Sequence, residues 1–246
     1  MVIFKSMIND ENIIPLDNEI QNAFVLASKT IEYDDIIQKL KSNDDKNKAI
    51  YILNLNDLKT QNDTNLFLNH LTGSPNDIRE ACAFKLNEFL NENIKNNTYK
   101  LLIENENAIN ILSNAINDIN PSICRLVIKT VKKFNNQTVF QNVIIKKSLD
   151  IINDENIPVI KKGYKINKHI FALYWNLEAI AGLKLTYNDM LKKLIINCAN
   201  MDEFYTIREK IAKILVLNPD FKDIEIEDIK LKLKSDPNFY VSRFFN

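Results

Sequence analysis

Glycine is scarce in this chain, and that scarcity limits the folds it can adopt. Three glycines and six prolines are spread over 246 residues, too few for the many tight turns of an all-β protein. Apolar residues recur almost throughout at spacings of three and four, which is the pattern of amphipathic helices. We therefore expect an all-α protein.

One stretch shows the pattern clearly. "SPNDIREACAFKLNEFL" (residues 74–90) opens with Ser74 as a helix N-cap and Pro75 in the first turn, and Asp77 lies near the positive end of the helix dipole. The apolar residues that follow lie on one face of a single helix, at Ile78, Ala81, Cys82, Leu86, Phe89 and Leu90.

Similar helices recur along the chain. "NPSICRLVIKTVKKF" (residues 120–134) and "DEFYTIREKIAKILVL" (residues 202–217) again carry an arginine early in an apolar stripe, and two weaker copies carry lysine there. The equivalent basic residues are separated by 33 to 46 residues, the period of helical-hairpin repeats. They are Lys46, Arg79, Arg125, Lys168 and Arg208.

A second set of amphipathic stretches lies between these helices, so the chain divides into pairs of helices. We expect one repeat array over residues 31–246, preceded by an N-terminal segment, residues 1–30, that contains a capping helix. The expected repeats are 31–57, 62–93, 105–134, 138–182, 186–218 and 224–246.

The arginine-bearing helices resemble the HEAT repeat, in which Asp-Pro or a similar pair precedes an apolar residue and an arginine on the second helix of each hairpin. The resemblance implies an α-α superhelix, a HEAT-like solenoid of about six hairpins. This chain departs from the pattern by one extra residue after Pro75 and Pro121. In its last copy, Val241 occupies the arginine position and Arg243 follows two residues later.

The arginines stand out because nearly all other basic residues are lysine: the four are Arg79, Arg125, Arg208 and Arg243. A planar guanidinium can bind a carboxylate through two parallel hydrogen bonds, which lysine cannot do. We therefore expect the repeated arginines to be structural, joining one hairpin to the next. Candidate partners are Asp77, Asp118 and Glu209.

The usual catalytic and metal-binding patterns are missing from the sequence. His70 and His169 are isolated, and there is no HExxH pattern, CxxC pair, EF-hand spacing or glycine-rich phosphate loop. The three cysteines, Cys82, Cys124 and Cys198, fall on apolar helix faces and are expected to be packed thiols. We expect no enzyme activity, no metal and no cofactor.

Charge and hydropathy limit the classes of partner and the cellular compartment that we expect for this protein. The 32 acidic and 32 basic residues give a formal net charge of zero, which argues against a nucleic acid as the main partner. No stretch approaches the roughly 20 apolar residues that span a bilayer, and the N-terminus has no signal-peptide pattern. We expect a cytoplasmic protein.

The stretch "HIFALYWNLEAIAG" (residues 169–182) holds the single tryptophan and is the best candidate for a binding surface. Its aromatic residues either fill the core or face a partner. The basic stretch "VIKKGYKINK" (residues 159–168) precedes them, and its lysines, Lys161, Lys162, Lys165 and Lys168, form either a positive groove with Lys129, Lys132 and Lys133 or a solvated face. The candidate partner-binding residues are Tyr174, Trp175, Glu178, Lys129 and Lys133.

The sequence favours a non-catalytic scaffold that binds a protein or peptide on the concave face of the solenoid. Two other functions stay open. One is a DNA-binding enzyme that resembles the HEAT-like alkylpurine DNA glycosylases, and the other is a HEAT-like accessory factor, such as a lyase or chaperone. Neither has a motif of its own in this sequence.

Overall fold

The computed structural model describes residues 25–27, 29–90, 97–135, 137–153 and 168–245. Within these ranges the regular structure is helical and no strand occurs. Most of the expected N-terminal capping helix lies outside the described residues, apart from Val25, Leu26 and Ala27, which are helical.

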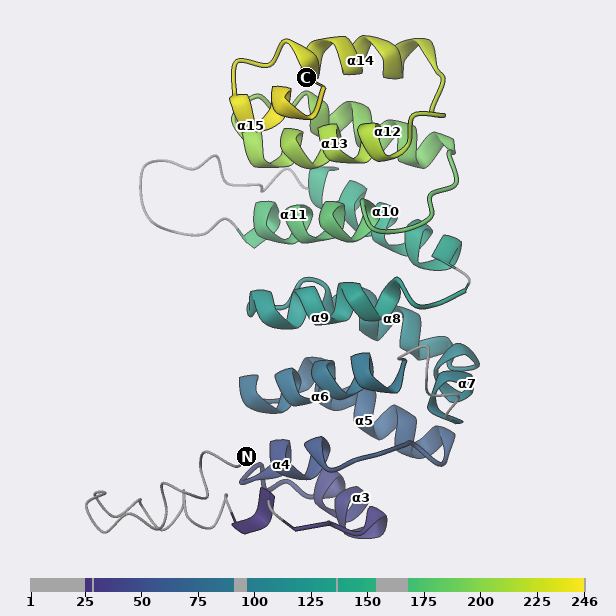
Figure 1. Ribbon diagram of the computed structural model, residues 1–246, viewed down its shortest axis with the longest axis vertical. Coiled ribbons are helices and arrows are strands. Elements are labelled where there is room, and N and C mark those ends of the chain that lie inside the picture. Colours follow the sequence, from purple (N-terminus) through teal and green to yellow (C-terminus); the bar gives the residue numbers. More distant parts are fainter. Residues whose placement is uncertain (1–24, 28, 91–96, 136, 154–167, 246) are drawn as a thin grey trace, which may run out of the picture.

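The helices pair into six successive hairpins (Figure 1). Their first helices are α3 (Tyr33–Lys41), α5 (Gln61–Gly73), α8 (Glu106–Ala115), α10 (Gln137–Asn153), α12 (Asp189–Ala199) and α14 (Ile224–Lys234). Their second helices are α4 (Lys48–Leu53), α6 (Asn76–Phe89), α9 (Pro121–Val131), α11 (Lys168–Ile180), α13 (Tyr205–Leu217) and α15 (Phe239–Ser242), the last followed by the 3-10 turn η1 (Arg243–Phe245).

First and second helices form two layers. Each first helix packs on the first helices of the neighbouring hairpins, and the second helices stack in the same way, with α6 on α4 and α9, and α13 on α11 and α15. The expected all-α solenoid of about six hairpins is thereby confirmed. A short helix that the sequence did not predict, α7 (Asn97–Ile103), packs on α5 and α8.

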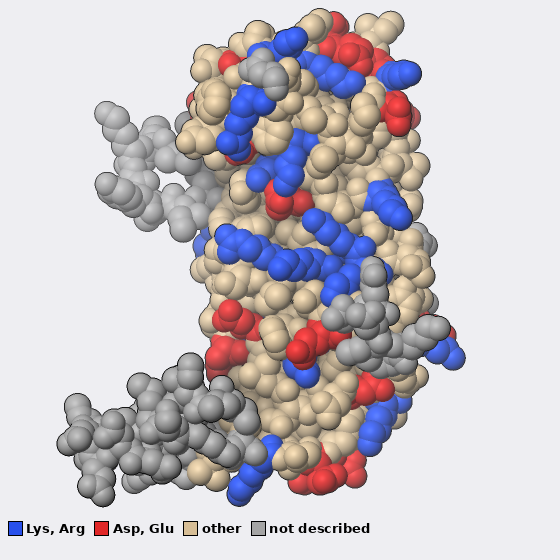
Figure 2. Space-filling model, viewed as in Figure 1, with Lys and Arg blue, Asp and Glu red and all other residues tan. Residues whose placement is uncertain are grey.

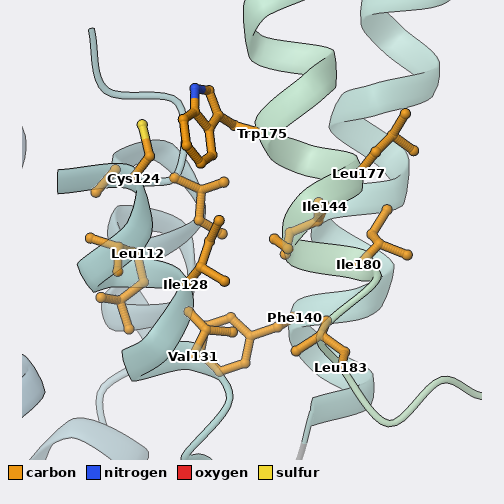
Figure 3. Packing of buried hydrophobic residues seen from close by; sticks show 14 of the residues in the cluster. Leu112, Cys124, Ile128, Val131, Phe140, Ile144, Trp175, Leu177, Ile180 and Leu183 are labelled. Carbon is orange, nitrogen blue, oxygen red and sulfur yellow. The ribbon is translucent and has the colours of Figure 1, made fainter. Parts of the chain in front are cut away.

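One junction in the second-helix layer differs from the others. The backbones of α4 and α6, α6 and α9, α11 and α13, and α13 and α15 approach closely, whereas those of α9 and α11 come within packing distance at far fewer points. Large side chains fill the space between α9, α10 and α11, among them Phe140, Ile144 and Trp175 (Figure 3). The α9–α11 junction is therefore wider at the backbone but still packed inside.

Polar side chains set the helix starts. The side-chain oxygen of the N-cap residue accepts a hydrogen bond from a backbone N–H of the first turn at six helices, which satisfies a donor that has no partner within the helix. These N-cap residues are Thr60, Asn105, Asn120, Asn188, Asp223 and Asn238.

The core is continuous along the stack and mainly aliphatic, with a few aromatic side chains such as Phe140 and Trp175. Because one face of each helix is apolar, each hairpin buries that face against its neighbours on both sides. Asn176 is an exception in this core. Its side chain on α11 is fully buried, and neither its amide nitrogen nor its amide oxygen has a hydrogen-bond partner among the described residues.

We expect Asn176→Leu to stabilise the protein, because leucine of similar shape removes two unpaired polar atoms that cost about 1–3 kcal/mol when buried. The matched control is Gln141→Met. Gln141 is equally buried, but its amide donates to the Thr186 carbonyl (2.6 Å) and accepts from the Thr186 N–H (2.8 Å), so this change should destabilise. Urea unfolding of both variants tests the pair, and a loss of stability in Asn176→Leu would contradict the prediction.

Candidate functional site

The exposed side of the second helices is the candidate site, and we call it the second-helix face. Figure 2 shows that Lys and Arg side chains gather in a band across this face, at the level between α9 and α11. Acidic side chains gather on the part of the face nearer α6, where Asp77, Glu80 and Glu88 lie on that helix. The face is therefore divided into regions of opposite charge.

Two of the repeated arginines join successive second helices. Arg79 of α6 donates through Nε and Nη2 to both carboxylate oxygens of Asp118, at 2.6 and 3.0 Å, and through Nη1 to the Ser74 carbonyl. Arg208 of α13 binds Asp236 in the same way, at 2.7 and 3.2 Å, and donates to two loop carbonyls. Both ion pairs are largely buried, which is the bidentate geometry that lysine cannot reproduce.

The two acceptors occupy the same local motif. Asp118 and Asp236 each lie two residues before the N-cap of the next second helix, Asn120 or Asn238, and each also accepts that residue's N–H at 2.8 Å. Burial raises the pKa of Asp236, but the hydrogen bonds from Arg208 and from the Asn238 N–H outweigh it, and the pKa falls below its ordinary value.

Sequence reasoning included Asp118 among the candidate partners but missed Asp236. Glu209 instead binds Arg243, at 2.9 Å and in a more exposed position. The repeated Asp-x-Asn pattern before a second helix was the signal that would have identified Asp236.

Arg125 of α9 differs from the other two. It is exposed, and no carboxylate among the described residues pairs with it; its guanidinium carbon lies 5.6 Å from the centre of the Trp175 ring. In the sequence, the motif position before α11 is Lys165 rather than aspartate, in "KIN". Lys165 lies outside the described residues, as do Lys161 and Lys162.

The two lysines expected at equivalent repeat positions lie at the ends of helices. Lys46 is exposed and precedes α4, and Lys168 is exposed at the first residue of α11. In the first hairpin the buried basic residue is Lys48, whose Nζ donates to the Ser42 carbonyl and pairs with Asp45 at 2.8 Å.

The aromatic residues of α11 divide between the core and the surface. Trp175 is 6% exposed and lies beside Cys124 in the junction with α9 (Figure 3), so it belongs to the core. Tyr174 and Phe171 are half-buried beside it. Lys210 of α13 lies over the Tyr174 ring, 4.3 Å from its centre.

Glu178 is fully engaged within the protein. It pairs with Lys210 at 2.9 Å and with Lys213 at 2.8 Å, which joins α11 to α13. Burial raises the pKa of Glu178, but the ammonium groups of Lys213 and Lys210 lower it by more, so the pKa lies below its ordinary value. Glu178 therefore neutralises part of the positive charge on α13.

The lysines of α9 and of the turn that follows it, Lys129, Lys132 and Lys133, lie on one side of the helix. Lys129 is exposed and forms no ion pair with the described residues. Lys133 donates to the Asn87 carbonyl near the end of α6, at 2.7 Å. Lys132 extends the other way, and its side chain lies against Gly182 just beyond α11. Together with Arg125 these lysines follow one side of the helix.

The groups that most often carry chemistry are buried or occupied. All three cysteines are free and buried, and burial raises the pKa of each thiol, to about 12 for Cys124. His70 lies within hydrogen-bonding distance of the Leu40 carbonyl and the Ser74 hydroxyl, and burial lowers its pKa. Among the described residues no cluster of three or more His, Cys, Asp or Glu could hold a metal ion.

None of the helices that the structure describes is both long and apolar enough to cross a membrane.

Comparisons with known proteins give one structural match to report. No protein-family model and no curated protein matches the sequence. Among solved structures, the chain is similar to a designed armadillo repeat protein, with a TM-score of 0.48 and 12% identity over 87% of this chain and 96% of that one.

We expect Arg79→Lys and Arg208→Lys each to lower the free energy of unfolding by about 1–3 kcal/mol, because lysine leaves part of a buried carboxylate unpaired. Arg243→Lys is the matched control, since its pair with Glu209 is more exposed and should contribute less than about 1 kcal/mol. Thermal and urea unfolding measure the differences, and equal effects at all three positions would refute a structural role for the first two.

We expect the three thiols of the folded protein to react slowly with a disulfide reagent at pH 8, because burial keeps them protonated and out of contact with solvent. Addition of denaturant should make all three react at the rate of free cysteine. A thiol that reacts rapidly in the native protein would overturn the interpretation of these cysteines as packing residues.

Proposed function

We propose that this protein is a non-catalytic helical-repeat scaffold that binds a protein or peptide segment on its second-helix face. A stack of hairpins presents one extended surface built from equivalent positions of successive helices. The observation that carries the proposal is that the potentially reactive side chains are buried or hydrogen-bonded, whereas the cationic side chains gather on one exposed surface. The cysteines and His70 are occupied in packing or hydrogen bonds, while cationic and half-buried aromatic groups converge on one side of α9 and α11.

The roles of the candidate residues change in this proposal. Trp175 supports the surface from below, since it is nearly buried, and Glu178 holds Lys210 and Lys213 in place. Lys129 and the half-buried Tyr174 are left for direct contact, and Lys133 contributes charge while it is anchored to α6. Three free cysteines fit the reducing cytoplasm that we expect as the compartment.

The alternative of a DNA-binding enzyme fits this surface less well. Proteins that hold single strands or extruded bases stack them on open aromatic faces. Here a cation already lies over the rings of both Trp175 and Tyr174. The accessory-factor alternative has no specific observation in its favour.

The test is photo-crosslinking in the native host with a photoreactive residue at one of two lysines. Position 129 lies on the second-helix face, and position 146 lies on α10 in the other layer; both are exposed. We expect a discrete crosslinked protein from position 129 at several times the yield from position 146. Equal labelling from both positions, or labelling from position 146 alone, would contradict the proposal.

A further inference from the structure

Positive charge is concentrated in the middle of the chain. Between Asp118 and Glu178 the sequence contains ten Lys or Arg and only three Asp or Glu, a surplus of seven positive charges. Because the formal net charge of the whole chain is zero, the remaining residues carry an equal negative surplus. The balanced total therefore conceals a strongly basic segment, which includes α9 and the start of α11.

Within this segment, one arginine has no carboxylate partner among the described residues, unlike its equivalents in other repeats. Arg79 and Arg208 each hold an aspartate of the next repeat in a bidentate pair. Arg125 occupies the corresponding place on α9 but has no carboxylate partner among the described residues, and the sequence places Lys165 where the aspartate would be. Its guanidinium rests over Trp175 with its donors unused by any acid that the structure describes.

Arg125 lies at the α9–α11 junction, where the backbones of two successive second helices make fewer close contacts than at the other junctions of this layer. Arg125, Lys129 and Lys132 lie along it at spacings of four and three residues, on one side of α9. Lys132 reaches across to Gly182 near the end of α11. The junction is thus a line of cations about two helical turns long, about 10 Å. The Trp175 ring beneath Arg125 is in turn in contact with the half-buried ring of Phe171.

We infer that the α9–α11 junction binds a short acidic protein segment whose carboxylates take the place of the missing aspartate at Arg125 and pair with Lys129 and Lys132. This inference rests on the proposed function and names the partner's chemistry.

The spacing of the cations suits an extended segment. Arg125 and Lys129 are separated by about 6 Å along the helix axis, and alternate side chains of an extended chain lie about 6.7 Å apart on the same side. A segment that runs along α9 with acidic residues at alternate positions can therefore place one carboxylate at Arg125 and the next at Lys129, and the long side chain of Lys132 lies within the same stretch. Arginine offers the first of them a bidentate site, which is the stronger form of charge-assisted hydrogen bond.

Nucleic acid meets the same positive charge but fits the junction less well. The Trp175 and Tyr174 rings are covered by Arg125 and Lys210, so they cannot stack on bases without displacing those cations. The cationic line is also short and is bordered on α6 by Asp77, Glu80 and Glu88, which would repel a longer phosphate backbone.

The experiment measures binding of fluorescein-labelled probes to the full chain by anisotropy. The first probe is a 12-residue peptide with glutamate at alternate positions between serine and leucine. The comparison probes are the same peptide with glutamine for glutamate, the same peptide with lysine for glutamate, and a 12-nucleotide oligo(dT). Of the four probes, we expect only the glutamate peptide to bind. Its binding should weaken as the salt concentration is raised.

Variants locate the binding. Lys129→Glu and Arg125→Gln should each raise the dissociation constant for the glutamate peptide at least about tenfold, because they reverse or remove a charge at the contact. The matched controls, Lys146→Glu and Lys193→Glu, change equally exposed lysines on α10 and α12 and should leave it within about twofold. Circular dichroism and thermal unfolding confirm that each variant folds.

Three results would overturn the inference: no binding of the glutamate peptide, binding that the control variants weaken as much as Lys129→Glu does, or tighter binding of oligo(dT) than of the peptide. These results are separable from a failure of the proposed function. If photo-crosslinking from position 129 captures a partner while the acidic peptide does not bind, the face binds a partner of another chemistry. If neither occurs, the proposed function itself fails.

Discussion

A helical hairpin of this chain cannot cover its own apolar side, and the rest of the structure depends on that constraint. Each helix is too short and too apolar on one face to be stable alone in water. When hairpins stack, each packs its apolar residues against the hairpin before it and the hairpin after it. The result is one continuous, mainly aliphatic core. The scarcity of glycine follows from the same design, since short loops and asparagine caps replace tight turns.

Polar contacts then fix how successive hairpins are placed. Hydrophobic packing is non-directional, so it does not by itself define the register between two stacked helices. The pairs Arg79–Asp118 and Arg208–Asp236 are directional, and each also involves the N-cap region of the following helix. This explains why arginine rather than lysine occupies positions 79 and 208 in a chain that uses lysine nearly everywhere else.

The architecture was predictable because it is repeated. Apolar spacing on helices such as 74–90 and the recurrence of arginine after a capped start were enough to predict a solenoid of about six hairpins. The ion pairs were harder, because a carboxylate about 30 or 40 residues away joins an arginine only after the hairpins stack. Asp236 was missed for this reason, although the Asp-x-Asn motif marks it once two examples are compared. The division between Trp175 in the core and Tyr174 at its edge depends on side-chain packing between three helices, which periodicity alone does not resolve.

The wider spacing between α9 and α11 has a mechanical consequence. In a linear array each repeat is stabilised by its neighbours, so cooperativity passes along the stack through the interfaces between them. Since α9 and α11 make fewer close backbone contacts than the other pairs of second helices, we expect their junction to transmit that coupling less strongly. We therefore expect the array to behave as two blocks of three hairpins, with bending and local unfolding concentrated at the boundary between them.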